Sequence, residues 1–261
     1  MTDLCFLVSA PRSGSTFLAR ALGQHPEFAM TIEAGWVALL RKSEMLAGTP
    51  SMHPIDDGEG FSTVGVVPGP YVDHATRAFR RAAGGFVESF AASVGAEGRY
   101  YGDKVHSHND VAFLLRTFPD VRFVVLVRDL RDVLVSSYTF QQKQATAWQE
   151  ASFVQRCEHL AHFDAEVCGL LDERGCPVVR YEDLIEQPGV ELTHVLEAIG
   201  LAMAPEVDAW LEGDAGALFQ SHGTSVTPRD SVGRWRSMLD AEQQAIANDL
   251  LGDALARHGY R

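Results

Sequence analysis

A short polar loop near the N-terminus carries the side chains best suited to chemistry. Residues 11–16 read Pro-Arg-Ser-Gly-Ser-Thr, between an apolar run and a helical pattern that begins at about Phe17. Backbone N–H groups in such a loop, with the positive end of the helix, suit an anion such as a phosphate. A fixed charge, hydroxyl donors and a glycine that admits close backbone approach add to this site. They are provided by Arg12, Ser13, Gly14, Ser15 and Thr16.

The loop differs from the phosphate loop of ATPases. The pattern GxxxxGK[ST] needs a first glycine and a lysine that are absent here, which disfavours an ordinary ATP or GTP hydrolase. For the loop taken alone, a plain strand-to-helix turn is the alternative.

A second candidate anion site follows the strongest apolar run, Val121–Val127. Arg128 stands directly after this run, and Ser136 lies two turns along the helix expected next. Two donors so placed can hold a second phosphate. The nearby Arg131 and Asp132 are expected to be solvated surface charges, since exposed ion pairs contribute little.

Apolar runs of strand length alternate with helical patterns along the chain. Strands are expected at Leu4–Val8, Phe28–Ile32, Tyr100–Val105, Val121–Val127 and Pro177–Tyr181. Helices are expected at about Phe17–Leu22, Trp36–Leu46, Tyr71–Val94, Asp110–Arg116, Leu130–Tyr138, Trp148–Arg174, Val190–Ile199 and Ala241–Arg257. This order predicts an α/β fold with a parallel sheet covered by helices on both faces. Ligands of such sheets bind at the carboxyl ends of the strands, so the loops after Val8, Val105 and Val127 should share one cleft.

Length and composition favour one domain over residues 1–261. The chain is 46% hydrophobic and has no run of eighteen apolar residues, so no membrane span is expected, and the N-terminus does not read as a signal peptide. Its four cysteines lack CxxC spacing, which indicates a reduced, cytoplasmic protein. A net charge of −13 argues against a nucleic-acid partner, so an anion site must be a local cluster of arginines. The sequence carries no signal for oligomeric state.

Two segments lack regular periodicity. Ala47–Pro70 is rich in glycine and proline, and loops of this length in compact domains are usually functional or disordered. We expect a substrate lid at 47–70, with a plain mobile insertion as the alternative. The second irregular stretch is Asp214–Val232.

The two anion-binding segments together resemble the cofactor-binding pair of the sulfotransferases that use 3′-phosphoadenosine 5′-phosphosulfate (PAPS). PRSGST is similar to their 5′-phosphosulfate loop, which implies that residues 12–17, Phe17 included, hold the 5′ side. LVRDLRDVLVSSY is similar to their 3′-phosphate motif, which implies that Arg128 and Ser136 grip the 3′-phosphate. The resemblance implies a three-layer domain of the P-loop type, PAPS as donor and 3′-phosphoadenosine 5′-phosphate (PAP) as product.

Two later segments extend the resemblance. Residues 180–184, RYEDL, are similar to a segment whose tyrosine approaches the adenine, and core packing is the alternative for Tyr181. Residues 229–235, RDSVGRW, resemble the loop that closes over the 3′-phosphate, although the usual RKG run is not intact. The resemblance assigns three residues of this loop to the cofactor: Arg229, Gly233 and Arg234.

The chemistry that the resemblance implies is in-line transfer of a sulfuryl group to a hydroxyl or amine of a small-molecule or glycan acceptor. Such transfer needs positioning, stabilisation of the leaving phosphate and a base, and no metal. Arg12 stands where many members have lysine and would stabilise the leaving phosphate. His106, in a K-x-H segment, and Glu33 are alternative bases that could also act together. Lys104 could contact the sulfuryl oxygens.

Other interpretations stay open. A kinase with a degenerate phosphate loop would depend on Mg²⁺ and ATP, and a non-catalytic binder of 3′-phosphoadenosine nucleotides would bind without turnover. A metal site is not expected, because the pair His106 and His108 lacks a third ligand of suitable spacing. On an expected helix, Cys157, His159 and His162 are better explained by packing or surface exposure.

Overall fold

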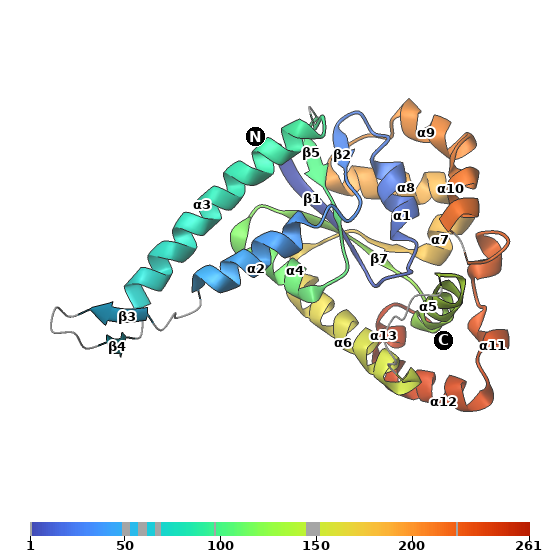
Figure 1. Cartoon of the computed structure of the whole chain (residues 1–261). Coiled ribbons are helices and arrows are strands. Elements are labelled where there is room, and N and C mark those ends of the chain that lie inside the picture. Colours follow the sequence, from blue (N-terminus) through green and yellow to red (C-terminus); the bar gives the residue numbers. More distant parts are fainter. Residues whose placement is uncertain are drawn as a thin grey trace.

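A parallel sheet forms the centre of the molecule (Figure 1). The computed structural model describes residues 2–48, 53–56, 62–65, 69–96, 98–144, 152–222 and 224–261. Strand order is β2-β5-β1-β7-β8, and β6 also pairs with β1. All of these pairings are parallel, as predicted. The strands are β1 (Asp3–Ser9), β2 (Phe28–Met30), β5 (Tyr100–Gly102), β6 (Lys104–Val105), β7 (Arg122–Val127) and β8 (Val178–Arg180).

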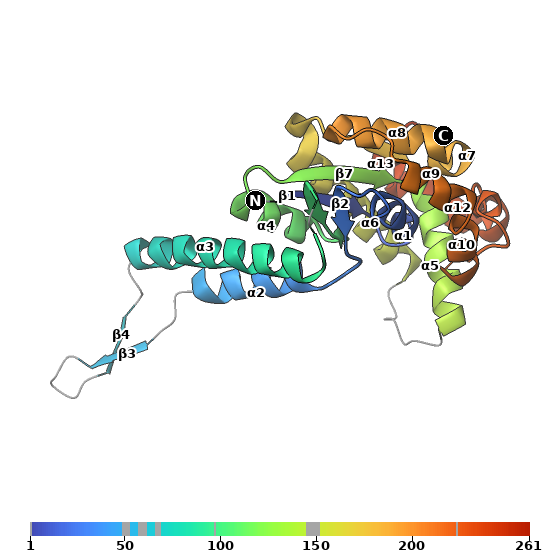
Figure 2. The same ribbon diagram turned by 90° about the horizontal axis from the view of Figure 1, so that it is seen from above.

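Helices cover both faces of this sheet, and their bounds lie close to most of those expected (Figure 2). The longer ones are α1 (Ser15–Leu22), α2 (Trp36–Gly48), α3 (Gly69–Ser93), α4 (His108–Thr117), α5 (Leu130–Gln144), α6 (Phe153–Leu171), α8 (Pro188–Ile199) and α12 (Ala241–Leu250). The shorter ones are α7 (Tyr181–Glu186), α9 (Pro205–Glu212), α10 (Ala215–His222), α11 (Trp235–Met238) and α13 (Gly252–Arg257). Two 3₁₀ turns span Asp172–Arg174 and Arg229–Ser231.

The two central strands explain the layering. Nearly every residue of β1 and β7 is buried, as expected for strands covered on both sides, and successive side chains point to opposite faces. One set joins the core beneath α3, α4, α5 and α6: Phe6, Val8, Phe123 and Val125. The other set joins the core beneath α1, α7, α8 and α9: Cys5, Leu7, Val124 and Leu126. The prediction of a three-layer α/β fold is confirmed.

Two sequence-based boundaries were wrong. The run Tyr100–Val105 breaks at Asp103 into β5 and β6, which pair with opposite ends of β1. Gly102 sits at this break, where a Cβ atom would lie 1.9 Å from the carbonyl oxygen of Cys5, so only glycine allows the strands to approach. The final helix is two helices, which meet at the buried Leu251 and at Gly252, a residue that weakens helix continuation.

Both irregular segments contain regular structure. Helix α10 and a 3₁₀ turn lie within Asp214–Val232, so that expectation was too simple. Within 47–70, β3 (His53–Asp56) and β4 (Ser62–Gly65) form an antiparallel hairpin, and the rest of 49–68 lies outside the described residues. The hairpin stands at the far ends of α2 and α3, away from the sheet (Figures 1 and 2). None of the helices in the described ranges has both the length and the apolar character of a membrane span.

Candidate functional site

The loop between β1 and α1 adopts the backbone geometry of an anion site. Arg12 and Gly14 have positive φ angles of 68° and 94°, and α1 starts at Ser15, so that its first N–H groups face the loop. Ser13 is buried, and its Oγ has no hydrogen-bond partner among the described residues. A buried hydroxyl without a partner is costly, so the loop is built to receive a hydrogen-bonding group.

Gly14 is required because Tyr181 packs directly against the loop. A Cβ atom on Gly14 would lie 2.4 Å from Cδ2 of the tyrosine ring. The Tyr181 hydroxyl pairs with Ser231 Oγ at 2.8 Å, and the Arg128 guanidinium lies 4.3 Å from the ring centroid. The ring is buried and braces the loop, so packing is the role that the structure shows. Its approach to an adenine stays a prediction.

Arg128, at the end of β7, reaches the phosphate loop as expected for neighbouring strand ends. Its Nη1 donates to the carbonyl oxygen of Arg12 at 3.0 Å, and its Nη2 donates to that of Ser231 at 2.6 Å. The side chain is buried, and its Nε has no hydrogen-bond partner within the described part of the chain.

Ser136 and Arg234 meet beside Arg128, although they are far apart in sequence. Ser136 Oγ lies 3.1 Å from Thr224 Oγ1, which also accepts a hydrogen bond from Arg234 Nη1 at 3.1 Å. Burial and the charge of Arg128 lower the pKa of Arg234 and that of Arg12. The charge of Arg128 thus opposes those of Arg12 and Arg234, and a phosphate bound among the three would neutralise this positive charge.

The C-terminal loop that carries Arg234 is anchored by an acid expected on the surface. Asp132 is buried, and its carboxylate accepts hydrogen bonds from the backbone N–H groups of Gly233 at 2.6 Å and Trp235 at 2.9 Å. Arg131 is buried too, pairing with Asp129 and lying 3.8 Å from the Trp235 ring centroid. The prediction of solvated surface charges was wrong because the backbone groups that pair with Asp132 and the ring that covers Arg131 lie about a hundred residues away in sequence.

Two other residues predicted to bind the donor, Phe17 and Arg229, have different surroundings. Phe17, on α1, packs against Trp210 with ring centroids 5.4 Å apart. Arg229 is exposed on its 3₁₀ turn, and its side chain makes no hydrogen bond or ion pair with the described residues. The structure therefore brings Arg234, and not Arg229, to Ser136.

The two candidate bases lie side by side. Glu33 Oε1 is 2.8 Å from Lys104 Nζ and 3.3 Å from His106 Nε2, and Lys104 Nζ also donates to Thr16 Oγ1 at 3.0 Å. These contacts bring three groups next to the phosphate loop: the carboxylate of Glu33, the amine of Lys104 and the imidazole of His106. They come from the loop after β2 and from the end of β6. These contacts, with that of Arg128 to Arg12, bring the loops after Val8, Val105 and Val127 together, while a cleft shared by all three stays a prediction.

The imidazole is oriented for proton transfer. His106 Nδ1 lies 2.8 Å from the carbonyl oxygen of Ser9, which can only accept, so Nδ1 carries the proton and Nε2 is free to take another. Burial lowers the pKa of His106, which keeps the ring neutral, and the hydrogen bond from Lys104 lowers the pKa of Glu33. A neutral imidazole beside a carboxylate is a competent proton acceptor.

Asp103 positions this pair and was not foreseen. Its buried carboxylate accepts hydrogen bonds from the backbone N–H groups of Glu33 at 2.7 Å, Ala34 at 2.9 Å and Lys104 at 2.8 Å. Glu33 has a φ of 53°, a left-handed conformation that a non-glycine residue adopts at a cost. One carboxylate therefore fixes both the strained turn and the strand that leads to His106.

The comparison with known proteins agrees with this arrangement. The model of the sulfotransferase family matches residues 5–205, which include both anion-binding segments and the paired bases. The chain belongs to the sulfotransferase family. Members of this family are transferases that act on sulfuryl groups.

Relatives of this sulfotransferase include a rhizobial protein and several solved domains. It is 26% identical to nodulation protein NoeE of Sinorhizobium fredii over 294 residues, covering 98% of this chain but only 66% of NoeE. The sulfotransferase domain from the curacin biosynthetic pathway matches with a TM-score of 0.62 at 16% identity, covering 100% of this chain and 99% of that one. Mouse sulfotransferase SULT7A1, complexed with PAP, matches with a TM-score of 0.57 at 11% identity, covering 97% and 85%. At these identities the solved domains show a shared fold.

The His108 ring packs edge-on against His162, with centroids 5.1 Å apart. Within the described ranges, no third metal ligand gathers around His106 and His108.

Proposed function

We propose that this sulfotransferase uses PAPS as donor and releases PAP. The observation that carries the proposal is the cluster of Arg12, Arg128 and Arg234, in which the charge of Arg128 opposes the other two, in a protein of net charge −13. A nucleotide with phosphates at both the 5′ and 3′ positions would neutralise this cluster. Two structural relatives were solved in complex with PAP: mouse sulfotransferase SULT7A1, and retinol dehydratase, whose complex also contains androsterone.

The donor set fits such a ligand. Ser13 Oγ and Arg128 Nε are buried without hydrogen-bond partners in the described part of the chain, and a bound phosphate supplies acceptor oxygens. The phosphate loop, residues 12–17, would hold the 5′ side with its backbone N–H groups and hydroxyls. Arg128, Ser136 and Arg234 would hold the 3′-phosphate. Roles for Tyr181 at the adenine and for Arg229 and Gly233 in the closing loop belong to the same proposal.

His106 and Glu33 act as a unit on the acceptor. An acceptor hydroxyl that enters between them donates its proton to His106 Nε2, while its oxygen forms a new bond to sulfur. The bond from sulfur to the 5′-phosphate oxygen breaks, and Arg12 stabilises the charge left on that phosphate. Glu33 stabilises the imidazolium, and Lys104, held by Glu33 and Thr16, contacts the sulfuryl oxygens. The scheme uses no metal.

The acceptor is proposed to be a hydroxyl or amine of a small molecule or glycan. Two exposed apolar side chains, Leu39 on α2 and Phe86 on α3, lie on the helices that follow the Glu33 turn. These helices and the hairpin between them would contact the acceptor, with 47–70 as its lid. We also propose that residues 1–261 form one domain. A cytoplasmic location is proposed because all four cysteines are free.

An acceptor screen with mass spectrometry tests this function. The protein is incubated with PAPS and mixtures of sugars, phenols and aliphatic alcohols, and products are sought that gain one SO₃ as PAP appears. The Arg12→Ala variant is the control, and its product should fall below detection. Transfer from ATP with Mg²⁺ in place of PAPS, or equal product with Arg12→Ala, would contradict the proposal.

A further inference from the structure

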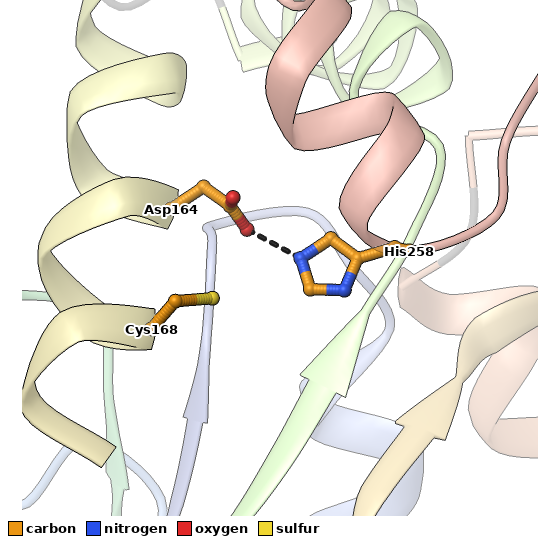
Figure 3. Close-up of side chains that lie close together, drawn as sticks. All are labelled: Asp164, Cys168 and His258. Carbon is orange, nitrogen blue, oxygen red and sulfur yellow. Dashed lines mark hydrogen bonds and ion pairs between the residues drawn. The ribbon is translucent and has the colours of Figure 1, made fainter. Parts of the chain in front are cut away.

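A second cluster of chemical groups lies behind the donor site, on α6 and the C-terminal segment. Asp164 and Cys168 stand four residues apart on α6, so they share one face of that helix. His258 follows α13 and faces both of them (Figure 3). The carboxylate oxygen, the sulfur and an imidazole nitrogen all lie within 4.8 Å of one another. None of the three takes part in the proposed transfer.

The cluster is largely shielded from solvent. The side chains of Asp164 and His258 are each 10% exposed, and Cys168 is half-buried. His258 Nε2 lies 2.6 Å from Asp164 Oδ1. Nitrogen and oxygen ligands of a tetrahedral zinc ion stand about 3.3 Å apart, given metal–ligand distances near 2.0–2.2 Å. A metal ion would therefore take the place of the proton between Nε2 and Oδ1 if the two side chains moved slightly apart.

The surroundings supply what three ligands alone lack. Arg257 pairs with Asp164 Oδ2, the oxygen that does not face His258, and can hold the carboxylate in place while Oδ1 binds a metal. Asp164, Cys168 and His258 also line a cavity of about 30 Å³, together with Ser13 and Arg128 of the donor site. That space is large enough for one water molecule, which would be the fourth ligand.

We propose that Asp164, Cys168 and His258 bind a divalent transition-metal ion of the zinc type. A thiolate and an imidazole select Zn²⁺ or Co²⁺ over Mg²⁺ and Ca²⁺, which prefer oxygen ligands. The ion links α6 to the C-terminal segment. Tyr260 in that segment donates to Glu182 Oε2, and Glu182 Oε1 accepts from the backbone N–H of Asp129, next to Arg128. The ion thus has a structural role behind the donor site, and the inference is independent of the proposed function.

Metal titration of the whole chain tests the site. Protein freed of metal with a chelator is titrated with Co²⁺, and the thiolate-to-cobalt charge-transfer absorption is followed. We expect saturation at one equivalent, displacement by Zn²⁺, and loss of the band in Cys168→Ser. The matched control Cys176→Ser, which removes another half-buried thiol, should keep the band. No band in the wild type, or a band that survives in Cys168→Ser, overturns the proposal.

A second measurement needs no variant. Zn²⁺ should slow alkylation of Cys168 at least tenfold in the wild-type protein, as measured by peptide mass spectrometry, and should leave Cys176 unchanged. Mg²⁺ at the same concentration should have no effect. Equal alkylation of Cys168 with and without Zn²⁺ would refute the site, whatever the protein's activity.

Discussion

Replacing Asp103 with asparagine tests how the base pair is positioned. Within the described part of the chain, the side-chain hydrogen bonds of Asp103 all go to backbone groups: its two oxygens accept the N–H groups of Glu33, Ala34 and Lys104. Asparagine has the same shape but offers one acceptor oxygen. If that oxygen keeps Glu33 and Lys104, the new NH₂ group faces the N–H of Ala34, and two donors oppose each other.

The cost follows from these three bonds. Hydrogen bonds to a charged group contribute about 1.5–3 kcal/mol each, and a buried donor left without a partner costs about 1–3 kcal/mol. Losing one bond and weakening two should lower the free energy of unfolding by roughly 2–4 kcal/mol. The Glu33 turn, with its φ of 53°, should then relax and move the carboxylate away from His106. A misplaced base pair should lower kcat by about 10–100-fold, or ~1.4–2.7 kcal/mol.

Two assays separate positioning from general damage. Amide hydrogen exchange should speed up at Glu33 and Ala34, and kcat should fall with an acceptor found in the screen, while the Kd for PAP changes less than about twofold. Asp110→Asn is the matched control, since it removes a carboxylate that pairs with Arg41 Nε at 2.6 Å outside the site. Normal kcat in Asp103→Asn, or a loss of PAP binding as large as the loss of kcat, would refute this reasoning.

Four further changes have definite expected results. Gly14→Ala should lower the free energy of unfolding by about 2–4 kcal/mol, because the methyl group meets Tyr181 at a positive φ; unchanged denaturant midpoints would contradict this. Arg12→Ala should lower kcat at least about 100-fold while PAP affinity falls less, since the loop's backbone donors remain; turnover assays with parallel calorimetry decide. His106 must be neutral to accept a proton, and burial lowers its pKa. The value of kcat should therefore rise with pH with an apparent pKa below 6.5, and an apparent pKa above 6.5 would argue against His106 as base. Asp132→Asn should weaken PAP binding about tenfold by loosening the C-terminal loop, and unchanged titration curves would exclude that anchoring role.

Sequence patterns located most of the site because a parallel sheet gathers its strand ends. The apolar runs predicted that Ser9, Val105 and Arg128 lie at one edge of the sheet. In the structure, His106 contacts Ser9 and Arg128 contacts Arg12 at that edge. Neighbouring strands fix these contacts whatever the sequence distance between them.

The rest depended on partners that a pattern does not reveal. Asp132 looks like a surface acid until its acceptor role toward Gly233 and Trp235 is seen. Asp103 sits within an apolar run, and only the turn at Glu33 shows why a charge is buried there. A buried charge is stable only with its partners, and tertiary contacts supply them.

Binding of PAP compared with adenosine 5′-monophosphate tests the central claim most directly. The two ligands differ in the 3′-phosphate, which Arg128, Ser136 and Arg234 are proposed to hold. Calorimetry should show that the wild type binds PAP about 10–150-fold more tightly, since a charge-assisted contact contributes roughly 1.5–3 kcal/mol, and that Arg128→Ala reduces this preference about tenfold or more. Equal affinity of the wild type for both nucleotides, or a preference that is as large in Arg128→Ala as in the wild type, would contradict the account.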